Sequence, residues 1–520
     1  MWMRALVPAG LALTVLISSC TQVQPPVSSA PSADAPFSPS YAAAECPPDV
    51  EIQTLVEHTC GYLTVLENRT KPDGQTIRLF VVRTPPPDAE ARSWPIFGVG
   101  GNLGEAGGQA SGTGAARTHA VIYGIDLRGI GHSTPNLACG EVDALSDEAV
   151  EASSSDEGFH RQFLDAIGAC RERLVGEGID LAAYGLDESA ADLEDLRIAL
   201  GIEEVGLDTK GTASRIAAEI LRRYADHVRF AVMDSPQFPQ FSEPAVALEG
   251  FEYALEQLAA GCNADAPCAD STPNLKALLA EAIANLDANP VEVTIADGVN
   301  VVQAGRPLTL VVDGAKLLRA VRLALGGDGP ANAGQLPAMI ADAAEGRVSG
   351  PLLQLLANDP TLCAGYRPMC IRQVFSLGAY LTQLCRDQLP FVDQEAMTQA
   401  AGESPAYQSV FGAESPYLAA CEVWDVDAAG PILGEPLETD VPMLVYVGQL
   451  DATSPFPLAR AAATTLPNAF LYEVPGQTHN VMGFSNCTIE IRNAWIDNPA
   501  LPPPDTSCLD ELEVSFSAPS

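Results

Sequence analysis

The sequence predicts an α/β fold, in which a mostly parallel, doubly wound sheet carries an inserted, mainly helical cap domain. Short apolar runs alternate with amphipathic helical segments, and this order favours parallel strands with helices on both faces. Between residues 239 and 435 the pattern changes to Ala- and Leu-rich helices, which indicates an insertion between two strands. The hydrophobic content of 47% can supply a large core.

The strands and helices of the sheet domain can be placed along the chain in order. The predicted strands are Thr76–Arg83, Ile96–Val99, Val121–Asp126, Val205–Leu207, Phe230–Met233, Pro442–Val447 and Phe470–Val474. The predicted helices are Asp187–Leu200, Ser214–Tyr224 and Leu458–Leu466. The insertion has one expected hairpin near Val291–Leu310. We therefore assign residues 45–238 and 436–520 to the core and residues 239–435 to the cap.

The beginning of the chain predicts export and lipid attachment. Arg4 precedes the apolar run Leu6–Ile17, which is too short to span a bilayer, and Cys20 follows after two serines. This arrangement resembles a bacterial lipobox, so we expect residues 1–19 to be a lipoprotein signal peptide; ordinary cleavage is the alternative. Acyl chains on Cys20 would anchor the protein to a membrane. Residues 20–44, rich in Pro, Ser and Ala, are expected to form a disordered tether.

The expected location is therefore the bacterial cell envelope, on its periplasmic or outer face. The cysteine content agrees, because removing Cys20 from the 13 cysteines leaves 12, an even number. No C-x-x-C pair occurs, and with six histidines this argues against zinc or another metal. We expect up to six disulfides in an oxidising compartment. The candidates are Cys46, Cys60, Cys139, Cys170, Cys262, Cys268, Cys363, Cys370, Cys385, Cys421, Cys487 and Cys508.

Counting does not determine which cysteines pair. Pairs between neighbours, such as Cys46–Cys60, Cys139–Cys170 and Cys487–Cys508, are the ones we put forward.

The net charge argues against one class of partner. The chain has 28 Lys and Arg and 67 Asp and Glu, which gives a net charge of −39. Such a surface repels phosphate backbones, so we expect no nucleic acid partner. No cofactor is implied, and we expect a monomer.

Several segments, in their order along the chain, carry a resemblance to a known family. These segments are Cys60–Val65 (CGYLTV), Gly98–Gly104 (GVGGNLG), Asp126–Thr134 (DLRGIGHST), Leu200–Pro236, Gly448–Pro455 (GQLDATSP) and Pro475–Val481 (PGQTHNV). Together they are similar to the secreted tripeptidyl-aminopeptidase-like (TAP-like) branch of the α/β-hydrolases, close to proline iminopeptidases. The resemblance covers nearly all of residues 46–508 and implies an α/β-hydrolase fold.

The family uses a serine triad. A serine at a tight strand-to-helix elbow, usually G-x-S-x-G, attacks a carbonyl group, while a histidine takes its proton and a carboxylate orients that histidine. The resemblance places the acid at Asp451 and the base at His479. It places the backbone N–H groups of the oxyanion hole at Gly101 and Thr212. We expect the remaining histidines to be surface or structural residues; they are His58, His119, His132, His160 and His227.

The nucleophile position departs from the family. Gapless alignment from the preceding strand and from the following helix places the elbow serine at Gly211. The elbow reads Thr209-Lys210-Gly211-Thr212-Ala213, and we expect Lys210 to be a solvated loop residue. Alternative nucleophiles are Thr209, Thr212 and Asp208, each of which lies off the aligned position. Ser214 is expected to do ordinary helix capping, and a water activated by His479 is a further route.

The sequence therefore predicts an exported lipoprotein of the aminopeptidase-like hydrolases that is catalytically impaired. A peptide or small acyl ligand would bind under the cap. The alternative is an active peptidase or esterase that uses an unorthodox nucleophile or activated water. A purely structural lipoprotein would not need to keep Asp451 and His479.

Overall fold

The computed structural model describes residues 37–48, 50, 58–86, 94–100, 120–295, 306–327, 329–357, 375–412 and 415–517. The chain divides into two units, Met1–Phe37 and Ser38–Ser520, and everything below concerns the second. The expected signal peptide and Cys20 lie outside the described residues, as do Gly101, His119, Cys363 and Cys370. Of the helices that are described, none combines the length and apolarity needed to cross a membrane.

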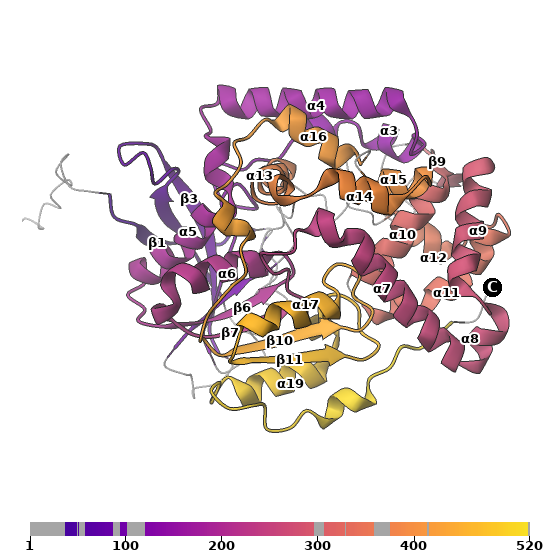
Figure 1. Ribbon diagram of the computed structural model, residues 1–520. Coiled ribbons are helices and arrows are strands. Elements are labelled where there is room, and N and C mark those ends of the chain that lie inside the picture. Colours follow the sequence, from indigo (N-terminus) through magenta and orange to yellow (C-terminus); the bar gives the residue numbers. More distant parts are fainter. Residues whose placement is uncertain are drawn as a thin grey trace, which may run out of the picture. The chain divides into compact units, whose positions relative to one another are not determined.

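The described residues form a nine-stranded sheet in the order β1-β2-β3-β5-β4-β6-β7-β10-β11 (Figure 1). Three strands at one edge run antiparallel to their neighbours, namely β1 (Ser40–Ala44), β2 (Thr59–Leu66) and β3 (Thr76–Thr84). The others are parallel to one another: β4 (Ile96–Val99), β5 (Ile122–Ile125), β6 (Val205–Lys210), β7 (Val228–Asp234), β10 (Met443–Gly448) and β11 (Ala469–Val474). All strands predicted from the sequence are therefore present, and most of the sheet is parallel.

Helices cover both faces of this sheet, so β10 is buried at every position along its length. Along β10, Met443 and Val445 belong to the apolar cluster that contains Phe456 of α17 (Phe456–Ala462). The intervening Leu444 belongs to the opposite cluster, with Trp495 of α19 (Asn486–Trp495). Figure 1 accordingly shows α17 and α19 on opposite sides of β10 and β11. The sheet is doubly wound, as predicted.

The remaining helices of the core also match the sequence pattern. The predicted helices at residues 187–200 and 214–224 are α5 (Leu186–Ala199) and α6 (Ala213–Tyr224). In α6, Ile216, Ala217 and Ile220 are buried against the sheet. The long helix α4 (Glu157–Gly176) and several short elements complete the core: α2 (Gly140–Asp143), α3 (Ser146–Glu151), η1 (Leu181–Tyr184), η2 (Ala225–His227), η7 (Ala463–Thr465), α18 (Val481–Phe484) and η8 (Ser507–Glu511).

Strand β1 differs from the sequence expectation, which placed Ser40–Ala44 in the disordered tether. These residues pair in register with β2, from Ser40 opposite Thr64 to Ala44 opposite Cys60. Tyr41 packs over Gly61, where a Cβ atom would lie 2.3 Å from the tyrosine oxygen. The composition concealed this strand because its pairing depends on a distant partner. Residues 40–44 therefore belong to the sheet.

The insertion is mainly helical and has its own apolar core. Its helices are α7 (Glu243–Ala264), α8 (Ala266–Ser271), α9 (Leu275–Ala288), α10 (Gly314–Gly326), α11 (Pro330–Ala344), α12 (Gly350–Ala357), α13 (Leu377–Asp387), η5 (Leu389–Phe391), α14 (Gln394–Ala401), α15 (Pro405–Phe411), α16 (Pro416–Trp424) and η6 (Pro431–Gly434). The expected hairpin is present as β8 (Val291–Ile295) and β9 (Leu308–Val312). Leu450 and Ala452, from the loop after β10, belong to this second core, so the cap packs directly on that loop.

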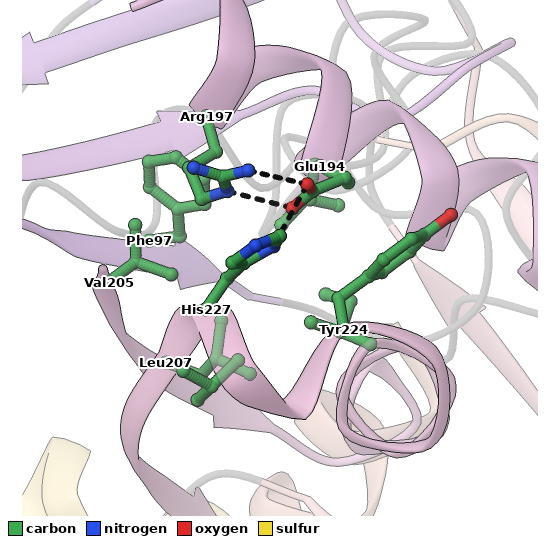
Figure 2. Close-up of a pocket in the computed structure, with 10 residues that line it drawn as sticks. Phe97, Glu194, Arg197, Val205, Leu207, Tyr224 and His227 are labelled. Carbon is green, nitrogen blue, oxygen red and sulfur yellow. Dashed lines mark hydrogen bonds and ion pairs between the residues drawn. The ribbon is translucent and has the colours of Figure 1, made fainter. Parts of the chain in front are cut away.

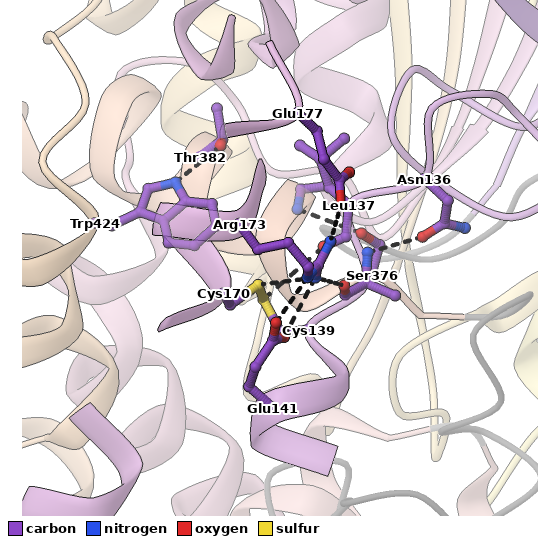
Figure 3. The surroundings of a disulfide bond; sticks show 12 residues. Asn136, Leu137, Cys139, Glu141, Cys170, Arg173, Glu177, Ser376, Thr382 and Trp424 are labelled. Carbon is purple, nitrogen blue, oxygen red and sulfur yellow. Dashed lines mark hydrogen bonds and ion pairs between the residues drawn. A yellow bond between two sulfur atoms is a disulfide. The ribbon is translucent and has the colours of Figure 1, made fainter. Parts of the chain in front are cut away.

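Disulfides brace both parts of the molecule. The structure forms the three pairs put forward from the sequence, Cys46–Cys60, Cys139–Cys170 and Cys487–Cys508. It also pairs Cys262 with Cys268 and Cys385 with Cys421. Figure 3 shows the Cys139–Cys170 bond beside Arg173 and Glu141, with Trp424 of α16 nearby. Such bonds stabilise a fold chiefly by restricting the unfolded chain.

Candidate active site

Three residues that the resemblance singled out follow three parallel strands. Gly211 comes directly after β6, Asp451 follows β10, and His479 follows β11. The carboxyl ends of parallel strands meet at one edge of a sheet, which is where α/β proteins place their sites. Nδ1 of His479 lies 3.0 Å from Oδ2 of Asp451, and the two side chains are 2% and 0% exposed.

The carboxylate of Asp451 is held from two directions. While Oδ2 faces the histidine, Oδ1 accepts hydrogen bonds from the backbone N–H groups of Thr453 (2.8 Å) and Ser454 (2.9 Å). A carboxylate fixed in this way keeps the imidazole in one orientation, which is the role of the acid in a serine triad. The described residues thus include a His–Asp pair with the geometry of a general base and its orienting acid.

The turn between β6 and α6, which the resemblance identifies as the nucleophile elbow, is formed by a glycine in the left-handed region. Gly211 joins β6 to α6 with φ +56°, in the left-handed region that ordinary residues adopt at a cost of about 1–2 kcal/mol. Its N–H donates to the carbonyl of Asp234 (2.9 Å), and its own carbonyl accepts from the N–H of Ser214 (3.1 Å). Thr212 is buried at the start of α6, where the first N–H groups of a helix lack intrahelical partners.

A segment that the sequence reasoning missed connects all three positions. We call residues 234–237 the bridge segment. Besides its bond to Gly211, Asp234 accepts from the N–H groups of Val481 (2.9 Å) and Met482 (2.8 Å), just after the histidine. The Ser235 carbonyl accepts from the Ser454 hydroxyl at 2.8 Å, and the Ser235 hydroxyl accepts from the N–H of Asn480 at 3.2 Å.

The bridge segment therefore bonds to the elbow, the acid loop and the histidine loop. Ser235 and Asn480, which contact each other, both have positive φ (+50° and +61°). Backbone strain at non-glycine residues persists where the surroundings enforce it, and functional sites are a common place for it. The only sequence signal was an aspartate at the end of a strand, and its role depends on residues more than 200 positions away.

Burial raises the pKa of Asp234 to about 6, although the two N–H donors, His479 and Lys210 all favour the ionised carboxylate. The expectation that Lys210 is a solvated loop residue was wrong. Lys210 is the last residue of β6, in register with Asp234, and it is partly buried. Its ammonium group therefore contributes to the electrostatics of the site.

Two of the three alternative nucleophiles, Thr209 and Asp208, have structural partners, whereas Thr212 is buried at the start of α6 and its side chain does not cap that helix. The hydroxyl groups of Thr209 and Ser214 lie 3.2 Å apart, and both residues are 2% exposed, between β6 and α6. Ser214 thus bonds to a strand residue rather than capping the helix. Asp208 points to the other face of the sheet, as successive strand residues do, and its Oδ2 accepts from Nη1 of Arg492 (2.9 Å).

The cap is fastened to the loops that carry Asp451 and His479. Three carbonyl groups at the end of α10 accept from these loops: Leu325 from the N–H of Ala452, Gly326 from the Thr453 hydroxyl, and Gly327 from the Thr478 hydroxyl. On α7, a Cβ atom at Gly250 would lie 2.4 Å from the Ala452 carbonyl oxygen. The cap helices are therefore in direct contact with the site.

The other described histidines lie elsewhere. His132 bonds to Asp126 through its backbone N–H (2.9 Å) and packs on Phe80. His58 precedes β2, and His160 lies in α4. His227 is 3.0 Å from Glu194, beside a small apolar pocket that Val205 and Val228, at the amino ends of β6 and β7, help to line (Figure 2). That cavity, about 10 Å³, has room for about one water molecule.

Comparison with known proteins gives one family match and several relatives. Residues 408–508 match the family model described as TAP-like protein, so this part of the chain is a TAP-like region. The chain is 28% identical over 225 residues to "Serine protease Hip1" of Mycobacterium tuberculosis, a match that covers 40% of this chain and 42% of that protein. It is 29% identical over 191 residues to "Tripeptidyl aminopeptidase" of Streptomyces lividans, covering 34% and 35% of the two chains.

These matches therefore span less than half of each relative. Among solved structures, the chain is similar to proline iminopeptidase from Mycobacterium smegmatis, with 13% identity, a TM-score of 0.40, and coverage of 82% of this chain and 96% of that one. The described residues themselves form the mostly parallel α/β sheet with an inserted helical cap that the sequence predicted. Within the described ranges, no group of three His, Cys, Asp or Glu residues is arranged to hold a metal ion.

Proposed function

We propose that this protein is a catalytically impaired member of the TAP-like α/β-hydrolases that binds a peptide or small acyl ligand beneath its cap. One observation carries the proposal: the turn at the elbow position has glycine at residue 211, while the His479–Asp451 pair is in place. Loss of a triad nucleophile typically lowers turnover by about 10⁶-fold. Thr209, Ser214 and Asp208 each have a structural partner, which argues against a substitute.

A peptide is the favoured ligand because relatives of this chain are named as a protease and an aminopeptidase. The contacts between the cap and the loops of Asp451 and His479 support binding at the cap–core junction. Binding does not require a nucleophile, and oriented backbone N–H groups at the start of α6 would still attract a carbonyl oxygen.

A second candidate is hydrolysis by activated water. The retained His479–Asp451 pair favours it, because an oriented histidine can take a proton from a water molecule as readily as from a hydroxyl group. In this route the water would occupy the space that a serine hydroxyl at position 211 would fill. No covalent intermediate would form.

The full chain, purified in detergent, tests both candidates. Wild type, Gly211→Ser and the matched control Gly211→Ala are incubated with a fluorophosphonate probe, and turnover is measured on aminoacyl-nitroanilides and nitrophenyl esters. We expect only Gly211→Ser to be labelled. Turnover by wild type that His479→Ala abolishes, without labelling, would instead support activated water. Labelling of wild type would show that another nucleophile exists and would contradict the impairment.

We also propose that the protein is exported and anchored to the cell envelope by lipid on Cys20. Its disulfide-braced fold supports an oxidising compartment. Metabolic labelling with radioactive palmitate checks the anchor. Wild type should be labelled and should sediment with membranes, whereas Cys20→Ser should be unlabelled. Equal labelling of the two proteins would contradict the assignment.

A further inference from the structure

Gln237, the last residue of the bridge segment, has an unusual environment. Its backbone N–H donates to the carbonyl of Gly211 at 3.3 Å, so the residue lies directly beside the elbow. Its side chain is buried, with 5% of the residue exposed. In the part of the chain that the structure describes, neither Oε1 nor Nε2 of this amide has a hydrogen-bond partner.

Burial of an amide without partners costs free energy, and folded proteins seldom leave such a group unpaired. The backbone on either side of Gln237 is already fixed. The Ser235 carbonyl accepts from Ser454, and the Phe238 carbonyl accepts from Nη1 of Arg215 at 3.3 Å. The backbone of Gln237 is therefore fixed beside the elbow, and partners for both ends of its side-chain amide have to come from outside the described residues.

The chemistry of the amide identifies a complementary partner. Nε2 donates two hydrogen bonds and Oε1 accepts them, so a side-chain amide can pair with a group that has both a carbonyl and an N–H. A peptide group has both, whereas an ester has only the carbonyl. A site built to bind an N–H discriminates strongly against a ligand that lacks it, since its own polar group is then left unpaired.

We propose that Gln237 is a ligand-binding residue whose side-chain amide pairs with a peptide group held beside Gly211. The site would thereby bind peptides more tightly than esters of the same acyl groups. This inference rests on the proposed function, because it needs a ligand between the elbow and the cap. To the proposed function, the inference adds the chemical class of the ligand and the residue that recognises that ligand.

The experiment compares two ligand pools on the full chain in detergent. One pool contains fluorescein-labelled tripeptides; the other has the same sequences with an ester in place of the central peptide bond. Kd is measured by fluorescence anisotropy for wild type, Gln237→Met and Gln383→Met. Gln383 is the matched control, because it is a buried glutamine on α13 whose Nε2 also lacks a partner among the described residues.

We expect wild type and Gln383→Met to bind the peptides at least about tenfold more tightly than the esters. Gln237→Met should bind the two pools within twofold of each other. A raised Tm in Gln237→Met would accompany this result, because an unpaired buried amide is replaced by an apolar chain of similar length. The Tm also shows that the variant is folded.

Two other outcomes would overturn the inference, and they differ in what else they affect. If Gln237→Met keeps the wild-type preference for peptides, Gln237 is not the recognising residue, and ligand binding by the protein stands. If wild type binds neither pool, ligand binding under the cap fails, and this inference fails with it.

Discussion

The Asp451–His479 pair and the turn at Gly211 lie at the same edge of the sheet, yet they are held in different ways. The pair is fixed through its side chains, by a 3.0 Å contact and by two backbone bonds to the carboxylate. The turn is defined by its backbone alone, by a positive φ at the start of a helix. The difference teaches that a tight strand-to-helix turn forms without any side chain at its centre, because glycine adopts this φ without strain.

A second histidine pair shows which features make the first one special. His227 and Glu194 are also 3.0 Å apart, but the His227 side chain is 40% exposed and the pair lies at the opposite edge of the sheet. Glu194 is shared with Arg197, whereas Asp451 is held by backbone N–H groups alone besides its histidine. Distance therefore does not distinguish a triad pair from a surface pair; burial and backbone support do.

The largest expected effect is a difference in hydrolysis rate between variants of these two pairs. In the Gly211→Ser protein, or in wild type if it turns over, His479→Ala should lower the rate of nitrophenyl ester hydrolysis by about 10³-fold or more, because the general base is lost. His227→Ala, the matched control, should change the rate by less than twofold. Equal losses in the two variants would show that the His479–Asp451 pair is not the base of this site.

The next largest effect is a difference in stability between variants of Asp451 and Glu194. Asp451→Ala should lower the free energy of unfolding by about 3 kcal/mol, because buried N–H groups of Thr453, Ser454 and His479 lose their acceptor. Glu194→Ala should cost less, about 1 kcal/mol, because the His227 side chain is 40% exposed and can turn to water when its partner is removed. Urea unfolding at pH 7 measures both. A larger loss for Glu194 would contradict the ranking by burial.

Much of this comparison could be predicted from the sequence. The strands and helices followed from periodicity, and the resemblance placed Gly211, Asp451 and His479 in the segments that follow β6, β10 and β11. Local pattern was sufficient because each of these segments comes after a strand of clear composition. The disulfide pairs between sequence neighbours were accessible for a similar reason.

The bridge segment and strand β1 could not be predicted in this way. Asp234 acquires its role from Val481 and Met482, and Tyr41 acquires its place from Gly61 in a partner strand. Neither relation leaves a trace in the local sequence. Lys210 was expected in a solvated loop because the apolar run ends at Leu207, but β6 continues for three more residues and includes Lys210.

The third prediction concerns Asp234, which connects the elbow to the histidine loop. Its pKa is about 6 in the folded protein, above the ordinary value of 3.8, so between these two values the folded state holds a proton that the unfolded state has released. Its contribution to stability is therefore present at low pH and is lost as pH rises through 6. The loss is about 3 kcal/mol for a shift of about two units.

Urea unfolding of wild type and Asp234→Asn from pH 4 to pH 7 checks this sign. The free energy of unfolding of wild type, minus that of the variant, should fall by about 2 kcal/mol over this range, since part of the full loss occurs below pH 4. Asp387→Asn serves as the positive control, because burial also raises the pKa of Asp387 to about 6. Its difference from wild type should change with pH in the same direction. A difference that is flat with pH for Asp234 alone would mean that its carboxyl group is not perturbed as the geometry implies.

The smallest effect tests the elbow by itself. Gly211→Ala should lower the free energy of unfolding by about 1–2 kcal/mol, because alanine at φ +56° is strained. Gly201→Ala is the matched control: its φ is +65°, and a Cβ atom there meets nothing within 4 Å, so it isolates the backbone cost. An equal loss at both sites would assign the whole cost at residue 211 to its φ, whereas an unchanged Gly211→Ala would show that the turn relaxes. A serine at this position carries the same strain, so a protein without covalent chemistry is more stable with glycine there.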